Sequence, residues 1–135
     1  MFALSYSPGA QEDVRQLKSI DPNAAALVLA TVQEIRGDQN LLDSLTIHEF
    51  EDRISKLDLT YNVKHWWEHF KRGRDLWRLR VIDDENLLTD YRIIYAYCIP
   101  ESKYYILGVV PRSFNYDSNH TQTKRILAEY EELCN

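Results

Sequence analysis

The hydrophobic and polar residues of this chain follow one pattern near its start and another in its second half. Apolar and small polar residues alternate over 2–7, which predicts a half-buried strand. Helical spacing follows over 10–20 and again over about 22–36, where Asp21 is a suitable N-cap and Gly37 a suitable C-cap. The chain is therefore predicted to open with a strand and two helices.

The second half begins with a strand pattern. From Asp75 onward, large apolar residues alternate with two arginines, in the order Trp77, Arg78, Leu79, Arg80, Val81. Runs rich in Ile and Tyr at 91–98 and 103–110 predict two further strands, and the short connection between them favours antiparallel pairing. A final amphipathic helix follows, with Asp117 or Ser118 as its cap and a buried side marked by Ile126, Leu127, Tyr130 and Leu133.

Residues 38–75 separate these halves. Thr46 and Glu49 fit a capping box, and the apolar face of the helix that they would start contains Ile47, Phe50, Ile54 and Leu57. Residues 57–60 also suit an extended segment. Near-helical spacing returns at Val63, Trp66, Trp67 and Phe70, so we expect the tryptophans to pack on the body of the domain, with a stacking platform for bases as the alternative. The region is predicted to be a partly helical insert.

Composition limits the class of protein. With 135 residues, 44% hydrophobic and 27% charged, the chain suits a single domain over 1–135. No apolar run approaches the ~20 residues that span a membrane, and the N-terminus has no basic region of the kind that begins a signal peptide. Two cysteines, Cys98 in a predicted strand and Cys134, are too few for a secreted disulfide framework. We expect a cytoplasmic protein in which Cys98 is a packed thiol.

Charge is distributed unevenly. The net charge is −5, but residues 1–70 hold 6 basic and 11 acidic residues, whereas residues 71–135 hold 10 of each. Over 71–80, five basic residues oppose only Asp75, which gives a local charge of +4. Such a block is either a solvated basic turn or an anion site. The acid excess therefore weakens long-range attraction of nucleic acid without excluding a local basic patch.

Three segments of this half resemble the RelE/ParE toxin superfamily, the toxins of bacterial type II toxin-antitoxin modules. They are 76–81 (LWRLRV), 90–95 (DYRIIY) and 109–112 (VVPR), and the order of the predicted elements is similar as well. The resemblance implies an α+β fold in the order β-α-α-(insert)-β-β-β-α. Its antiparallel sheet would pack against the N-terminal helices and a C-terminal helix.

In the RelE branch, the resemblance implies an endoribonuclease that cuts mRNA in the ribosomal A site without a metal or other cofactor. The 2′-hydroxyl of the substrate attacks the phosphorus, and fixed cations stabilise the charge that accumulates there. Arg78 and Arg80 match the basic positions of the family's second strand, Arg92 matches its Tyr-Arg motif, and Arg112 matches the arginine after the last central strand. The expected partners are mRNA, the ribosome and a cognate antitoxin that covers the sheet.

One departure from the family concerns the general base. The best-known ribonuclease of the family has lysines on its second strand, whereas this chain has arginines, which bind phosphate but do not readily accept a proton near neutral pH. The candidates for that role are Tyr116, offset from the family's late tyrosine, and His120 at the start of the last helix. His120 could equally be a solvated residue in the first turn of that helix.

Three other functions stay open. A ParE-like chain would inhibit DNA gyrase without chemistry, and a RelE-fold protein that has lost toxicity would only bind a partner. The sequence from His65 to His69 also fits the H-x-x-E-H pattern of zinc peptidases, which on a helix would place both histidines on one face. That pattern needs a third ligand and a larger scaffold than 135 residues provide, so the basic residues remain the main candidate site.

Overall fold

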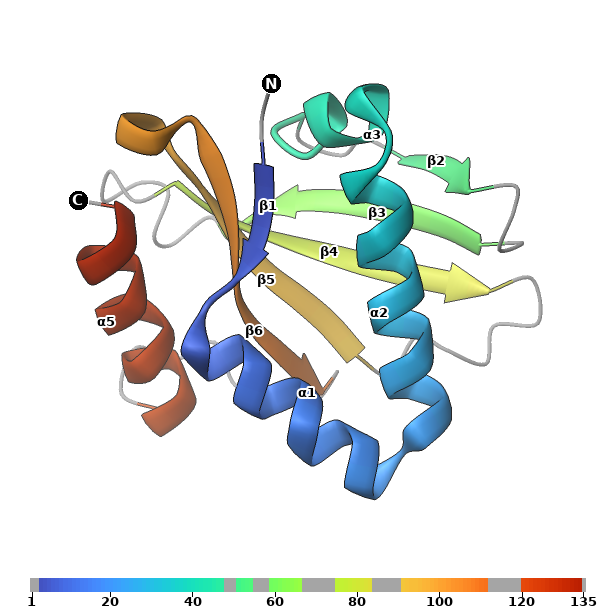
Figure 1. Cartoon of the computed structure of the whole chain (residues 1–135), viewed down its shortest axis with the longest axis horizontal. Helices are drawn as coiled ribbons and strands as arrows, with labels where there is room; N and C mark the ends of the chain where they lie inside the picture. The colour runs from blue at the N-terminus through green and yellow to red at the C-terminus, as the bar shows by residue number, and fades with distance from the viewer. Residues whose placement is uncertain are drawn as a thin grey trace.

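A computed structural model describes residues 3–47, 51–54, 59–66, 75–83, 91–111 and 120–134. These ranges contain an α+β fold in which helices cover both faces of one sheet (Figure 1). The helices are α1 (Pro8–Ile20), α2 (Pro22–Arg36), α3 (Gln39–Ser44) and α5 (Thr121–Cys134), with a 3₁₀ turn η2 (Ile99–Glu101). The strands are β1 (Ala3–Tyr6), β2 (Glu51–Ile54), β3 (Leu59–His65), β4 (Leu76–Asp83), β5 (Tyr91–Cys98) and β6 (Lys103–Pro111).

The sheet has six strands in the order β1-β6-β5-β4-β3-β2. Pairing is antiparallel from β2 through to β6, but β1 lies parallel to β6. The prediction of an antiparallel sheet is therefore wrong at this edge. The two helices that follow β1 carry the chain across one face of the sheet before it returns, so local strand patterns did not reveal the direction of this pairing.

The N-terminal helices cover the first face. Asp21 caps α2 as predicted, because its carboxylate accepts a hydrogen bond from the backbone N–H of Ala24 at 3.1 Å. Ser7 caps α1 in the same way through Ala10, so that α1 begins two residues before the predicted helix. The core between these helices and the sheet includes Val14, Val28, Val32, Leu79, Ile93 and Tyr95.

The C-terminal helix packs on the opposite face, over β5 and β6. Its buried side carries Ile126 and Tyr130, as predicted. Gly108 allows this close approach, since a Cβ there would lie 3.0 Å from Ile126 Cδ1. Arg125 fastens the helix to α1, donating to the two carboxylate oxygens of Asp13 at 2.9 and 3.1 Å.

A disulfide between Cys98 and Cys134 joins the end of β5 to the end of α5, with their Cα atoms 4.6 Å apart. The prediction that Cys98 is a packed thiol is therefore wrong. Both cysteines face the cluster beneath α5, and the packing of that helix brings them together across 36 positions of the sequence. Sequence spacing alone gives no sign of this contact.

The insert differs most from the sequence interpretation. Its helical part is α3, which starts at the N-cap Asp38 rather than at Thr46. Ile54, assigned to the predicted helix, lies in β2, and Val63 lies in β3 instead of on a helix. Thr46 and Ile47 are described but follow the end of α3 without starting a helix, and residues 48–50, 55–57 and 67–70 of the two predicted helices lie outside the described ranges. Two strands therefore extend the sheet beyond β4.

No helix among the described residues is both long enough and apolar enough to span a membrane.

Candidate nucleic-acid interface

Two rows of aligned residues cross the sheet on the face that carries α5. Along the first row, Lys64 of β3 is in register with Arg78 of β4, which is in register with Ile94 of β5. Along the second row, Asn62, Arg80 and Arg92 are aligned in the same way. Because successive side chains of a strand point to opposite faces, residues two positions apart share a face. The five polar residues of these rows therefore belong to one surface.

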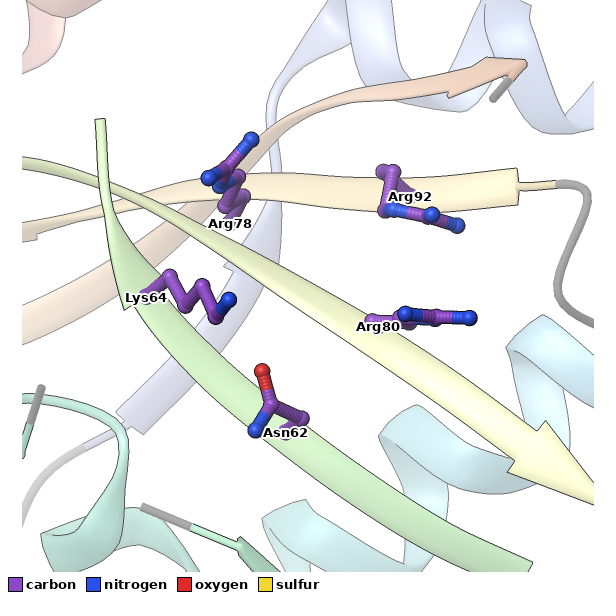
Figure 2. A pocket seen from close by; sticks show the side chains of 5 residues that line it. All are labelled: Asn62, Lys64, Arg78, Arg80 and Arg92. Atoms are coloured by element: carbon purple, nitrogen blue, oxygen red, sulfur yellow. The ribbon is translucent and has the colours of Figure 1, made fainter. Parts of the chain in front are cut away.

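These five side chains line a pocket of about 120 Å³, formed by Asn62, Lys64, Arg78, Arg80 and Arg92 (Figure 2). Four of them are cations, and the lining residues that the structure describes include no carboxylate. A water molecule takes up about 30 Å³ of liquid, so the pocket has room for a small anionic group of a few heavy atoms. The local surface is strongly basic although the chain as a whole is acidic.

The helix α5 borders this pocket without covering it. Ile94, which follows Arg78 along the first row, lies in the apolar cluster beneath α5 together with Ile126. In the second row, Arg92 is in register with Val110, which belongs to the same cluster. Along these two rows the apolar residues beneath the helix thus give way to polar ones, at Arg78 in the first row and at Arg92 in the second, whereas Leu76 and Trp66 continue the apolar cluster beyond β5.

One arginine of the pocket has a hydrogen-bond donor that no described residue accepts. The Nε atom of Arg80 is buried and has no hydrogen-bond partner among the described residues. Nη1 of Arg92 donates to the backbone carbonyl of Tyr91 at 3.2 Å, which orients that guanidinium group. A buried donor without a partner is costly, and an anion bound in the pocket would satisfy it.

The chemistry that this arrangement supports is anion binding. Guanidinium groups present several N–H donors in a planar fork that fits phosphate oxygens, and strands hold these groups with less freedom than loops do. Fixed cations around one oxyanion also stabilise negative charge that develops during a reaction. A phosphate group of a nucleic acid matches the charge and size of the pocket.

The structure brings together three of the six residues that the sequence interpretation placed in the site: Arg78, Arg80 and Arg92. Arg112 and Tyr116 lie outside the described residues, as do Lys71, Arg72 and Arg74 of the basic block. For these residues the sequence interpretation stands as an expectation.

His120 does not line the pocket. It lies immediately before α5, is exposed, and its Nδ1 accepts a hydrogen bond from the backbone N–H of Gln122 at 3.2 Å. This contact satisfies one of the N–H groups that a helix start leaves unpaired. The imidazole is exposed, as expected for the solvated residue of the alternative interpretation, but it lies just before the first turn of the helix and caps it.

Sequence reasoning missed Lys64 and Asn62, which come from β3 within the insert. A signal was present: Leu59, Tyr61 and Val63 alternate with polar residues, which is the period of a strand with one polar face. The near-helical spacing of Val63, Trp66 and Trp67 obscured that alternation. Without β3, the pocket would lack two of its five lining side chains.

The structure describes two residues of the tryptophan- and histidine-rich segment of the insert, His65 and Trp66. Trp66 is buried and packs in the cluster beneath α5, as expected for a packing residue. His65 is the last residue of β3, with its ring 3.8 Å from that of Trp77, so the helix assumed for the zinc-peptidase pattern is wrong at this residue. Glu68 and His69 lie outside the described residues. Among the described residues, no group of three or more His, Cys, Asp or Glu could hold a metal ion.

Comparison of this chain with protein-family models, with curated protein sequences and with solved structures gives no match. The functional assignment therefore depends on the pocket and on the residues around it.

Proposed function

We propose that this chain is a RelE-like toxin that cleaves mRNA as a metal-independent endoribonuclease. The observation that carries the proposal is the pocket on β3, β4 and β5, which four cations line without a carboxylate among the described lining residues. Arg78, Arg80 and Arg92 are also the residues at which the sequence resembles the toxin superfamily. The substrate class is single-stranded RNA, presented with its backbone against the open part of the sheet.

In this proposal the scissile phosphate occupies the pocket. Arg80 and Arg92 lie opposite each other and bind its non-bridging oxygens, and the buried Nε of Arg80 gains a partner. The 2′-hydroxyl of the preceding nucleotide attacks phosphorus, and the 5′-oxygen leaves. Because negative charge accumulates on the phosphoryl oxygens during attack, the arginines bind the transition state more strongly than the substrate.

The acidic total charge fits a substrate that is delivered by a larger assembly. Long-range attraction of RNA depends on the summed charge, which is −5 here, whereas contact depends on the local patch. We therefore propose that the protein acts in the cytoplasm on mRNA held by the ribosome, with the Cys98–Cys134 pair reduced there, and that it binds RNA alone with modest affinity. A cognate antitoxin would block activity by covering the basic face.

The test is to incubate purified protein with an mRNA on translating ribosomes and to map the new RNA ends. Wild-type protein should produce discrete cuts with 2′,3′-cyclic phosphate ends. Arg80→Ala and Arg92→Ala should each lower the cleavage rate by about 10²-fold, the usual loss when one group that stabilises an oxyanion is removed. Arg15→Ala, an exposed change on α1, serves as the matched control and should cleave at the wild-type rate.

Intact mRNA with the wild-type protein would refute the nuclease. One observation favours a non-catalytic function in that event: three of the four cations are arginines, which bind phosphate but do not exchange protons. Growth arrest with intact mRNA and altered DNA supercoiling would then indicate a ParE-like gyrase inhibitor. Harmless expression would indicate a RelE-fold binding protein.

A further inference from the structure

Lys64 occupies a distinctive position in the pocket. It lies on β3 in register with Arg78, and its side chain extends from β3 toward β4, beside Asn62 (Figure 2). It lines the same pocket as Arg80 and Arg92. The row that contains Lys64 lies two residues along the strands from the row that contains Arg80 and Arg92, a separation of about 6.7 Å. A lysine side chain has four flexible carbons, which allow its ammonium group to move toward the arginine row.

The five lining residues differ in what they can do with a proton. Arginine side chains in proteins do not lose their proton, and the amide of Asn62 does not exchange one in acid-base catalysis. A lysine ammonium group can donate a proton and recover it from solvent. Among the described residues that line the pocket, Lys64 is thus the single side chain suited to proton transfer.

We propose that Lys64 is the general acid that protonates the leaving 5′-oxygen, a role that rests on the proposed ribonuclease function. The bond from the 2′-oxygen to phosphorus forms as the bond from phosphorus to the 5′-oxygen breaks. The 2′-hydroxyl proton passes to water, and the Nζ proton of Lys64 passes to the 5′-oxygen. The products are a 2′,3′-cyclic phosphate and a 5′-hydroxyl, and the neutral amine regains its proton from water.

In this proposal the arginines and Lys64 act on different oxygens of the scissile phosphate. The arginines keep their charge throughout and hold the non-bridging oxygens, whereas Lys64 acts on the bridging oxygen. A general acid contributes when the leaving group is a poor one, as an alkoxide is. If the leaving atom is sulfur, a thiolate departs without protonation, and the need for Lys64 disappears.

The experiment compares two forms of one RNA sequence, with either oxygen or sulfur at the 5′-bridging position of the scissile phosphate. On the oxygen substrate, Lys64→Met should lower the single-turnover rate by 10²–10⁴-fold, the range for loss of a general acid. Lys64→Arg keeps the positive charge but should show a similar loss. On the sulfur substrate the leaving group needs no proton, so this loss should disappear and both variants should cleave at close to the wild-type rate. Lys18→Met, an exposed change on α1, is the control and should match wild type on both substrates.

Three results would overturn the role of Lys64. If Lys64→Arg cleaves the oxygen substrate at the wild-type rate, positive charge is what matters and not proton donation. If Lys64→Met stays equally slow on both substrates, the lysine binds or positions the RNA. If wild-type protein cleaves neither substrate, the ribonuclease function itself fails, and this result is distinct because it does not depend on any variant. Circular dichroism of each variant should match wild type, since Lys64 is exposed.

Discussion

Arg80 of β4 and Arg92 of β5 lie directly opposite each other, so that two positive charges occupy one cross-strand pair of the sheet. Figure 2 shows the two side chains extending in the same direction along their strands. Like charges at facing positions destabilise a sheet by roughly 0.2–1 kcal/mol. The Nε of Arg80 is also buried, and no residue in the described ranges accepts a hydrogen bond from it. The fold thus carries a local cost that a bound anion would remove.

The first prediction concerns the loss of stability caused by the facing charges of Arg80 and Arg92. Inorganic phosphate should raise the unfolding temperature of the wild-type protein more than sodium chloride of equal ionic strength does. At roughly 100 times its dissociation constant, phosphate should add about 2.7 kcal/mol to the free energy of unfolding. Differential scanning fluorimetry with increasing phosphate concentration measures the effect.

Arg92→Gln supplies the matched test of this prediction. It should abolish most of the response to phosphate, and without phosphate it should be as stable as wild type or slightly more stable, because the facing charge is gone. Arg15→Gln should leave the response unchanged, since that residue is exposed on α1 and pairs with Glu12. Equal responses to phosphate and to chloride in the wild type would contradict an anion site.

The second prediction concerns the attachment of α5. Asp13 accepts hydrogen bonds from both Nη atoms of Arg125 and from the backbone N–H of Val109 at 3.0 Å. Asp13→Asn should therefore lower the free energy of unfolding by about 2 kcal/mol, as expected when a charged hydrogen-bond acceptor is replaced. Urea denaturation measures the change. Glu12→Gln, next to it on the exposed side of α1, should change stability by less than about 0.5 kcal/mol.

The third prediction concerns the disulfide. Cys98 and Cys134 are 36 positions apart, and closing a loop of this size is worth about 3.8 kcal/mol in the chain-entropy account. Cys134→Ser, and reduction of the wild type, should each lower the free energy of unfolding by that order. RNA cleavage should persist in both cases, because the pocket residues lie on other positions of β3, β4 and β5. A thiol count of two in the unreduced, denatured wild-type protein would disprove the bond.

The fourth prediction concerns Asp75 at the start of β4. Burial raises the pKa of its carboxyl above the ordinary 3.8, while a hydrogen bond from Trp77 Nε1 at 2.6 Å and the nearby charge of His65 oppose the rise. An acid with a raised pKa holds its proton more tightly in the folded state than in the unfolded state. The ionisation of Asp75 therefore lowers the free energy of unfolding as the pH rises from 3.8 through the raised pKa. Below pH 3.8 the carboxyl is protonated in both states, and this loss of stability is absent.

Asp75→Asn tests the sign of this effect. The amide oxygen can still accept from Trp77, but no charge is buried. At pH 7 the variant should be at least as stable as wild type, and wild type should gain stability relative to the variant as the pH falls toward 3.8. Urea unfolding at a series of pH values gives the comparison. A variant that is less stable at pH 7 and recovers at low pH would show that ionised Asp75 stabilises the fold.

The central part of the fold could be predicted because its local signals agree. In β4, a two-residue alternation places Trp77 and Leu79 toward the core and Arg78 and Arg80 on the other face, which is the arrangement observed. Capping residues fix the start of α2, where Asp21 precedes Pro22. The three arginines of the pocket lie on these predicted strands, and the register that pairs Arg80 with Arg92 and Arg78 with Ile94 places them on one face.

The insert could not be predicted in the same way because its signals compete. Val63 and Trp66 have helical spacing, yet Leu59–His65 forms a strand, which is aligned with β4 at seven positions. Such pairing depends on residues that follow later in the sequence. The parallel edge strand and the disulfide depend likewise on tertiary contacts.

Strands β2 and β3 also determine how another protein can engage the basic face. Because β3 pairs with β4, both β4 and β5 lie in the interior of the described sheet, where neighbouring strands on both sides take up their main-chain hydrogen bonds. A peptide can extend a sheet only at a margin with unpaired backbone groups, and here the margins are β1 and β2. An inhibitor that shields the cations must therefore lie across them and recognise them through acidic side chains, as a mimic of the RNA backbone would.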